Sequence, residues 1–328
     1  MINRWALAMG LGLFAAALAA PAQPTAKTYR LGRLYWGSPP LTQMDVASQS
    51  AFLERLRALG YREGDNLIIE RRFGDGQPDR LREAARELAQ SNVDAIFTTG
   101  DEAIRAAKEA TETIPIIMMA CDAVESGLIQ SLARPGGNIT GITCVSGDLG
   151  AKRVEILREL IGNYSRLAVL YNPRDPHTRN QVAGVQMAVR QWAVETQLFG
   201  VANPTELEAA FSEMARKRTD SLLVVGDSFT VMHRSTITQL AAKHGLPAVY
   251  AFKEFVDAGG LAAYGPNLIE VLHVAAGHVD RVFRGAKPAD LPVEQPTKFE
   301  LIINLKTAKA LGLTIPPSLL LRADRVIE

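Results

Sequence analysis

One strand-and-turn pattern occurs twice in the sequence. Residues 94–101 (DAIFTTGD) and 220–227 (DSLLVVGD) each run from an aspartate through an apolar stretch of strand length to Gly-Asp. A helical stretch follows each copy, and a proline then stands in another apolar run, at Pro115 and at Pro247. Strand, turn, helix and buried strand form one βαβ unit. Because such a unit stands in each half of the chain, the sequence predicts two similar α/β lobes, each built on a parallel sheet.

The order of strand-like and helical segments predicts how the chain divides between the lobes. Five β-α units complete the first lobe, with a further helix predicted at about residues 124–132. A late helical segment is expected to return to this lobe. About 300 residues remain after the N-terminal segment, which is more than one core usually serves. We therefore predict a first lobe from residues 28–147 with about 266–295. The second lobe and a closing tail are predicted from residues 148–265 with about 296–328.

The predicted strand ends carry polar, small and aromatic residues. Loops that leave the strand C-termini of a parallel sheet form its ligand crevice, so two facing sheets would share one cleft. Hydroxyls and helix-start amides bind an anionic group, carboxylates bind an ammonium group, and aromatic rings stack on a flat surface. This mixture suits a small zwitterionic or polyhydroxyl ligand with an apolar part. The residues predicted to bind the ligand are Trp36, Ser38, Thr98, Thr99, Gly100, Asp101, Asp122, Thr143, Asn172, Asp227, Ser228, Phe252 and Tyr264, and a wider set adds Tyr35, Ser146, Tyr171, Asp175 and Phe229.

Several of these side chains have a structural alternative. Thr99 and Ser228 could act only as helix caps, and Thr99 with Glu102 has the spacing of a capping box. Asp101 could only complement a helix dipole. Asp101 and Glu102 would also repel a ligand carboxylate at the same helix start. Asp227 is the stronger candidate for an ammonium group, because Asp101 shares its turn with threonines that suit a carboxylate.

The first 22 residues have the features of a secretory signal peptide. Arg4 supplies an early positive charge, residues 5–20 are apolar, and Ala20-Pro21-Ala22 fits a cleavage site. The apolar run is shorter than the roughly 20 residues that a bilayer span needs. No cysteine stands near the cut, so no lipid attachment is expected. The sequence therefore predicts an exported, periplasmic protein.

Charge and motifs argue against several classes of function. The 36 basic residues nearly balance the 35 acidic ones, so nothing indicates a nucleic-acid partner. The sequence lacks a nucleophile elbow, a zinc-protease motif, a phosphate-binding loop and a Cys-x-x-Cys pair. The five histidines are scattered without metal-ligand spacing. We predict a binding protein that is not an enzyme and uses no cofactor and no metal.

The two cysteines, Cys121 and Cys144, each end an apolar strand-like run. They could therefore lie on neighbouring strands beside the cleft, and export permits a disulfide between them. The sequence favours two free buried thiols, with the disulfide as the alternative.

Four longer motifs stand out in the sequence: residues 131–141 (SLARPGGNITG), 241–248 (AAKHGLPA), 264–267 (YGPN) and 304–313 (NLKTAKALGL). They resemble one family of ABC-transporter substrate-binding proteins, the family that includes tryptophan- and tyrosine-binding members. The resemblance covers essentially the whole chain after the N-terminal segment. It implies the type I periplasmic-binding-protein fold, with two flavodoxin-like lobes, three crossings between them and the ligand in the cleft.

The resemblance also implies which loops bind ligand and which partner follows. Residues 98–101 and 120–122 correspond to the ligand-contacting loops of the first lobe. The family often has Ser-Asp-Pro where this chain has Cys121-Asp122-Ala123, which keeps the aspartate and changes its loop. The expected protein is a monomer that delivers a small amphipathic molecule, such as an aromatic amino acid, to an ABC permease in the inner membrane. The alternatives are a sensory binding protein and a secreted enzyme that uses Asp122 or Asp227.

Overall fold

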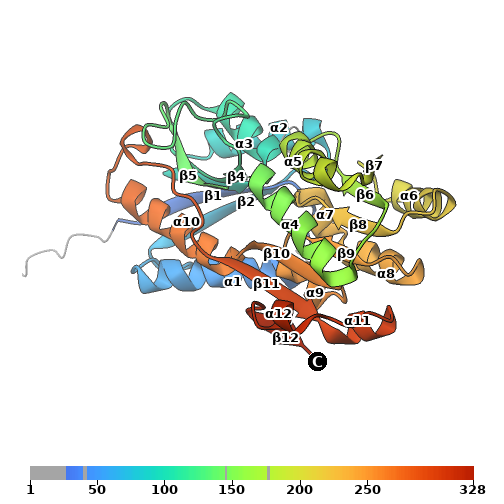
Figure 1. Cartoon of the computed structure of the whole chain (residues 1–328). Helices are drawn as coiled ribbons and strands as arrows, with labels where there is room; N and C mark the ends of the chain where they lie inside the picture. Colours follow the sequence, from blue (N-terminus) through green and yellow to red (C-terminus); the bar gives the residue numbers. More distant parts are fainter. Residues whose placement is uncertain (1–26, 40–42, 145, 176–177) are drawn as a thin grey trace, which may run out of the picture.

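Two sheets, each with helices on both faces, make up the structure (Figure 1). This computed structural model describes residues 27–39, 43–144, 146–175 and 178–328 of the chain. The segment predicted to be a signal peptide lies outside these residues.

The first sheet has the strand order β2-β1-β3-β4-β5, and its strand pairs are parallel. This is the 2-1-3-4-5 order of flavodoxin-like folds. Strands β3 and β5 are almost wholly buried, as expected where helices cover both faces of a sheet. The strands are β1 (Tyr29–Tyr35), β2 (Leu67–Phe73), β3 (Ala95–Thr99), β4 (Ile116–Cys121) and β5 (Ile139–Cys144).

The second sheet repeats this order and extends it. Its order is β12-β11-β10-β9-β8-β6-β7, in which the strands from β7 to β10 follow the same 2-1-3-4-5 arrangement. Only the β10–β11 pair is antiparallel among the described pairs. The predicted fold class is therefore confirmed. The strands are β6 (Arg166–Tyr171), β7 (Glu195–Gly200), β8 (Ser221–Val224), β9 (Ala248–Tyr250), β10 (Ala262–Pro266), β11 (Phe299–Asn304) and β12 (Arg325–Ile327).

Each sheet separates two apolar cores. In the first lobe, α2 (Pro78–Gln90) and α3 (Asp101–Ala110) pack on one face, and α1 (Gln43–Ala58) and α10 (Leu268–Phe283) pack on the other. In the second lobe, α6 and α8 bury one face of the sheet, and α4 and α5 bury the other. The remaining helices are α4 (Ser146–Ile161), α5 (Thr178–Val189), α6 (Thr205–Arg216), α7 (Ser228–Met232), α8 (Arg234–Lys243), α9 (Lys253–Asp257), α11 (Leu305–Ala310) and α12 (Pro317–Leu320), with single 3₁₀ turns at Arg190–Trp192 and Pro288–Asp290.

The chain passes between the lobes three times. It leaves the first sheet after β5, returns after β10 to form α10, and leaves again before β11. Figure 1 shows α10 beside α1, although its neighbours in sequence, β10 and β11, lie in the second sheet. The third crossing is held to β5 by backbone hydrogen bonds, from the Glu294 amide to the Gly141 carbonyl (2.9 Å) and from the Thr143 amide to the Glu294 carbonyl (2.9 Å).

Arg153, on α4, is buried at the base of the second lobe. Its Nε donates to the Tyr264 carbonyl on β10 (2.8 Å), and its Nη1 donates to Gln181 Oε1 on α5 (3.3 Å). Gln181 Nε2 in turn donates to the Gly226 carbonyl (3.1 Å), just before α7. Burial lowers the pKa of Arg153 to about 10. The Arg153 guanidinium therefore links α4, which follows the first crossing, to β10, which precedes the second crossing.

The structure joins Cys121 and Cys144 in a disulfide. The two residues are direct partners on the parallel strands β4 and β5, and their Cα atoms are 4.3 Å apart. The prediction of two free thiols is therefore wrong. The sequence placed both residues at strand ends, but only the pairing register decides that they face each other.

The sequence also favoured a helix from about residue 124 to 132, where the structure has turns. Asp122 and Gly127 both have positive φ (51° and 72°), which a continuous helix does not allow. Leu128 and Ile129 are nevertheless buried against the first core, so the segment supplies apolar contacts without helical geometry. Within the described residues, none of the helices is both long and apolar enough to span a membrane.

Candidate functional site

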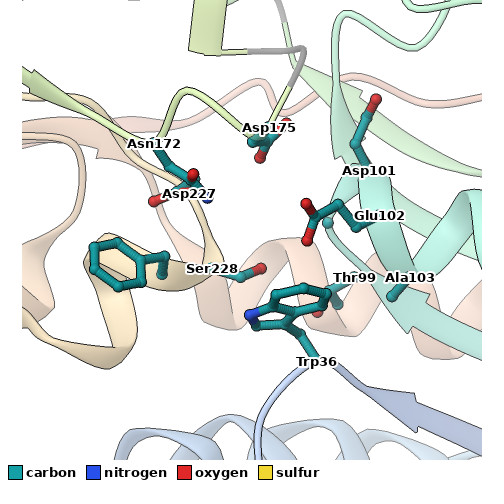
Figure 2. A pocket seen from close by; sticks show the side chains of 11 residues that line it. Trp36, Thr99, Asp101, Glu102, Ala103, Asn172, Asp175, Asp227 and Ser228 are labelled. Carbon is teal, nitrogen blue, oxygen red and sulfur yellow. The ribbon is translucent and has the colours of Figure 1, made fainter. Parts of the chain in front are cut away.

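A cavity lies between the two lobes, at the carboxyl ends of the parallel strands (Figure 2). Loops and helix starts from both sheets contribute to its wall, as expected at the switch points of doubly wound sheets. The lining residues are Trp36, Thr99, Gly100, Asp101, Glu102 and Ala103 from the first lobe, with Asn172, Asp175, Asp227, Ser228 and Phe229 from the second.

In the first lobe, Gly100 sets the geometry of the wall. It has φ 83°, a value that glycine adopts without penalty, and it is the N-cap residue of α3. No side-chain hydrogen bond caps this helix start, so the predicted capping box of Thr99 and Glu102 is not formed. Asp101 is turned away from the centre of the cavity, toward Arg105, and Glu102 is turned into it (Figure 2). Trp36 follows β1 and forms one side of the cavity.

In the second lobe, Asp227 is the N-cap residue of α7. Its Oδ1 accepts from the Thr230 amide (2.7 Å), and the Asp227 amide donates to Thr230 Oγ1 (3.0 Å), which completes a capping box. Ser228 is the first residue of α7. Asn172 follows β6, and its Oδ1 accepts from the Arg174 amide (3.0 Å). These bonds fix the side of the cavity that the second lobe provides.

The two lobes meet closely around the cavity. A Cβ atom on Gly100 would lie 2.7 Å from Ser228 Oγ, and one on Gly37 would lie 2.6 Å from Met232 Cε. Asn180 Nδ2, on α5, also donates to Asp122 Oδ2 of the first lobe (3.3 Å). Gly37 and Gly100 leave room for the two lobes to approach each other, and the hydrogen bond from Asn180 to Asp122 joins them.

The cavity has an acidic lining. Among the lining residues that the structure describes, four are acidic (Asp101, Glu102, Asp175 and Asp227) and none is basic. The pKa of Glu102 is raised to about 7, first by burial and then by the negative charges of Asp175 and Asp227, while the positive charge of Arg174 opposes the shift. Half-burial also lowers the pKa of His233, at the end of α7, against the opposing effect of Asp227.

The structure brings seven of the thirteen predicted ligand-binding residues to the cavity wall. Two members of the wider set, Asp175 and Phe229, also lie there. These residues come from four segments far apart in the sequence, and the shared feature that predicted them was their position after a strand. The seven are Trp36, Thr99, Gly100, Asp101, Asn172, Asp227 and Ser228.

The other six predicted residues lie outside the cavity wall. Thr98 Oγ1 donates to the Leu34 carbonyl within the sheet (3.0 Å), and Thr143 Oγ1 accepts from the Ala123 amide (3.1 Å). Phe252 packs against the core of the second lobe. Tyr264 packs against that lobe's other core. Asp122 is buried at the lobe contact described above, and Ser38 is exposed after β1.

Sequence reasoning missed Glu102 as a residue of the site. It treated this side chain as a capping partner and as a charge that repels a ligand carboxylate. Gly100 carried the signal that could have found it, because a glycine N-cap makes Asp101 the first helical residue and Glu102 the second. Among the described residues, no group of three or more His, Cys, Asp or Glu side chains is arranged to hold a metal ion.

The amino-acid sequence matches a family model of known proteins. The family model described as ABC transporter substrate binding protein matches residues 44–327. The tyrosine-binding protein of Clostridioides difficile is 28% identical over 268 residues, which are 81% of this chain and 76% of that protein.

Two solved structures match the fold with both lobes included. One is an ABC domain from Streptococcus pneumonia in complex with L-Trp, which is 25% identical with a TM-score of 0.84. The other is a conserved domain protein from Vibrio cholerae, which is 25% identical with a TM-score of 0.85. Each match covers 92% of this chain and 100% of the other.

Proposed function

The chain belongs to the family of ABC transporter substrate-binding proteins, and we propose that it captures a small amphipathic ligand of the aromatic amino-acid class in the cavity between its lobes. It then delivers this ligand to an ABC permease. The family consists of solute-binding proteins rather than enzymes. The observation that carries the proposal is the cavity itself, because both lobes line it and the lobes meet around it.

The shape of the cavity gives the ligand a physical role in closure. A ligand that touches both lobes stabilises the closed form by the difference between its affinities for the closed and open forms. Trp36 on the first lobe and Ser228 on the second face the same space (Figure 2). One molecule in this space therefore contacts both lobes at once.

The lining suits a ligand with a flat apolar part and an ammonium group. The Trp36 indole offers a stacking surface, and carboxylates from both lobes attract an ammonium group. The relatives support this class of ligand, since one is named as a tyrosine-binding protein and one contains L-Trp.

Export and delivery complete the proposed role. The N-terminal segment has signal-peptide features, so the protein acts in the periplasm as a monomer and presents its closed form to a permease in the inner membrane. A sensory binding protein would present the same form to a receptor. Loss of ligand uptake in cells that lack this protein, with uptake restored by its expression, would support delivery; normal uptake would favour sensing.

Isothermal titration calorimetry with L-tryptophan and L-tyrosine tests ligand capture. If the Trp36 indole stacks on the ligand, Trp36→Ala weakens binding by about 1–3 kcal/mol. Trp192→Ala is the matched control, because Trp192 lies in the second lobe against Arg158, away from the cavity lining. If the Trp36 variant and the wild type are both folded and bind the ligand with equal affinity, the Trp36 indole does not contact the ligand.

A further inference from the structure

We propose that the Cys121–Cys144 disulfide is a redox switch for the ligand affinity of the interlobe cavity. The oxidised form favours closure of the lobes, and reduction by a dithiol weakens closure. This inference rests on the proposed function, because it takes the cavity as the ligand site, and it adds a means of regulating that site. The position of the disulfide in the fold carries the argument.

The disulfide lies at the cleft end of the first sheet. Cys121 is the last residue of β4 and Cys144 is the last residue of β5, and the parallel register pairs them directly. The carboxyl ends of parallel strands form one edge of a sheet, and the cavity lies at that edge. The covalent bond therefore fixes the spacing of two strand ends on the side of the first lobe that faces the second.

Asp122 connects the disulfide to the second lobe. It directly follows Cys121 and has φ 51°, a left-handed conformation that costs a residue other than glycine free energy. Its amide donates to the Cys144 carbonyl (2.7 Å), so both cysteines hold this turn in place. From this position Asp122 Oδ2 accepts from Asn180 Nδ2 of the second lobe (3.3 Å). This contact between the lobes therefore depends on the strand pair that the disulfide joins.

β5 is the side of the disulfide that other contacts hold in place. The first crossing leaves the sheet after Cys144, and backbone hydrogen bonds join Gly141 and Thr143 of the same strand to Glu294 of the third crossing. The end of β4 instead leads into the turn at Asp122. Reduction therefore leaves β5 attached to the crossings and gives the Asp122 turn more freedom, so its strained φ can relax and its carboxylate can leave Asn180.

The exposure of the two cysteines determines where a dithiol attacks. Cys121 is partly exposed, whereas Cys144 is 5% exposed. A thiolate of the reagent therefore attacks Cys121 Sγ, the S–S bond breaks and Cys144 Sγ leaves as a thiolate. The second thiol of the reagent then releases the Cys121 thiolate and closes the disulfide of the reagent. Two electrons pass from the dithiol to the protein disulfide, and two protons complete the cysteine thiols.

The lobe contact couples this reaction to ligand binding. The apparent affinity of a ligand that contacts both lobes is set by the fraction of the protein that can close. One hydrogen bond typically changes such an equilibrium by about 2–10-fold. Loss of the bond between Asp122 and Asn180 should therefore weaken ligand binding by a factor of this size. By linkage, the ligand also makes the disulfide harder to reduce.

Calorimetry of the two redox forms tests the switch. L-Tryptophan and L-tyrosine are titrated into oxidised protein and into protein reduced with a dithiol, and circular dichroism checks that both forms are folded. We expect the reduced form to bind the better of the two ligands about 3–10-fold more weakly. Equal affinities would overturn the inference and leave the proposed function intact. If neither amino acid binds the oxidised protein, the inference and the proposed function both fail.

Asp122→Gly tests whether the disulfide acts through the lobe contact. Glycine accepts the positive φ of this position without a penalty, and the variant lacks the carboxylate that bonds to Asn180. The oxidised variant should bind about 3–10-fold more weakly than the oxidised wild type, and reduction should then add little. The oxidised comparison holds even if the reduced protein unfolds. Wild-type affinity of the variant, or an undiminished loss on reduction, would contradict the inference.

The double variant Cys121→Ser/Cys144→Ser is the control for the reductant, because it cannot form the disulfide. It should bind ligand as the reduced wild type does, with or without the dithiol, and a response to the reagent would count against the inference. Linkage supplies a reciprocal measurement on the wild type. For a tenfold difference in affinity, saturating ligand should lower the midpoint potential for reduction of the disulfide by about 30 mV. A midpoint potential that is the same with and without ligand would overturn the inference.

Discussion

The two Gly-Asp turns have the same sequence pattern and different structures. In the first lobe Gly100 is the N-cap residue, Asp101 lies inside α3, and its carboxylate pairs with Arg105. In the second lobe Asp227 is itself the N-cap residue of α7 and lines the cavity. The helix therefore begins one residue earlier, relative to Gly-Asp, in the first lobe.

This one-residue difference decides which carboxylate reaches the ligand site. Successive residues of a helix point about 100° apart, so a shift of one position turns Asp101 away from the cavity and turns Glu102 into it. The comparison teaches that a repeated motif conserves the position of the turn without conserving the direction of its charged side chain.

The lobes also differ in that the first contains a disulfide beside the cleft. Reduction of this disulfide is expected to have the largest effect on stability. The fourth and fifth strands of the first sheet are joined by Cys121–Cys144, whereas β9 and β10 are held without a disulfide. Reduction should lower the free energy of unfolding by about 2–4 kcal/mol. Denaturation followed by fluorescence, with Trp36 and Trp192 reporting on their own lobes, should show the first lobe more affected.

A thiol reagent provides the control for this prediction. Unreduced protein should take up no label even in denaturant, and reduced protein should take up two equivalents. Labelling of the unreduced, denatured protein would show free thiols and contradict the structure.

The two turn aspartates should respond in opposite ways to the loss of charge. Asp227→Asn keeps a good N-cap residue but removes a charge from the cavity, so we expect ligand affinity to fall about 10–100-fold and the melting temperature of ligand-free protein to change little. Asp101→Asn breaks the pair with Arg105 and should lower the free energy of unfolding by about 1–2 kcal/mol. Calorimetric titration and thermal denaturation measure the two quantities; equal affinity losses in both variants would remove the distinction.

The two turn glycines should separate closure from folding. Gly100→Ala forces a strained φ that costs about 1–2 kcal/mol, and its Cβ would meet Ser228 of the opposite lobe, so ligand affinity should fall. Gly226→Ala would place its Cβ 2.5 Å from the Ala251 Cβ within the second lobe. The expected cost is about 1–3 kcal/mol of folding stability. If Gly100→Ala changed only stability, the close approach of the lobes would not be part of binding.

The smallest effect concerns the ionisation of Glu102. Its folded-state pKa is raised from 4.5 to about 7, so the folded protein favours the neutral carboxyl group. Stability is therefore greatest below pH 4.5, falls as pH rises toward 7, and stays lower above that pH. Glu102→Gln should raise the free energy of unfolding of ligand-free protein by about 1–2 kcal/mol above pH 7 and leave it unchanged below pH 4.5. Urea titrations across this range, with Glu109→Gln as control, measure the effect; a gain that persists below pH 4.5 would assign it to packing.

Local sequence was sufficient to predict the two sheets and the turns at the cavity. Apolar runs of strand length followed by Gly-Asp located β3 and β8, and the residues after β1 and β6 supplied Trp36 and Asn172. The predictions of these two strands succeeded because strand length, turn chemistry and burial on both faces are properties of short segments. The prediction of a helix near residue 124 failed, because its apolar residues are buried by contacts with the first core rather than by helical periodicity.

The sequence by itself determined the duplicated α/β units, the strand ends that line the cavity and the acidic composition of its turns. Tertiary structure alone decided that Cys121 faces Cys144 and that Glu102 faces Asp175 and Asp227 across the lobes. The physical reason is the separation along the chain over which each interaction acts. Propensity and turn geometry act over a few residues. Strand register and the approach of two lobes depend on packing between segments that are far apart in the chain, 23 residues for Cys121 and Cys144 and more than 70 for Glu102 and Asp175.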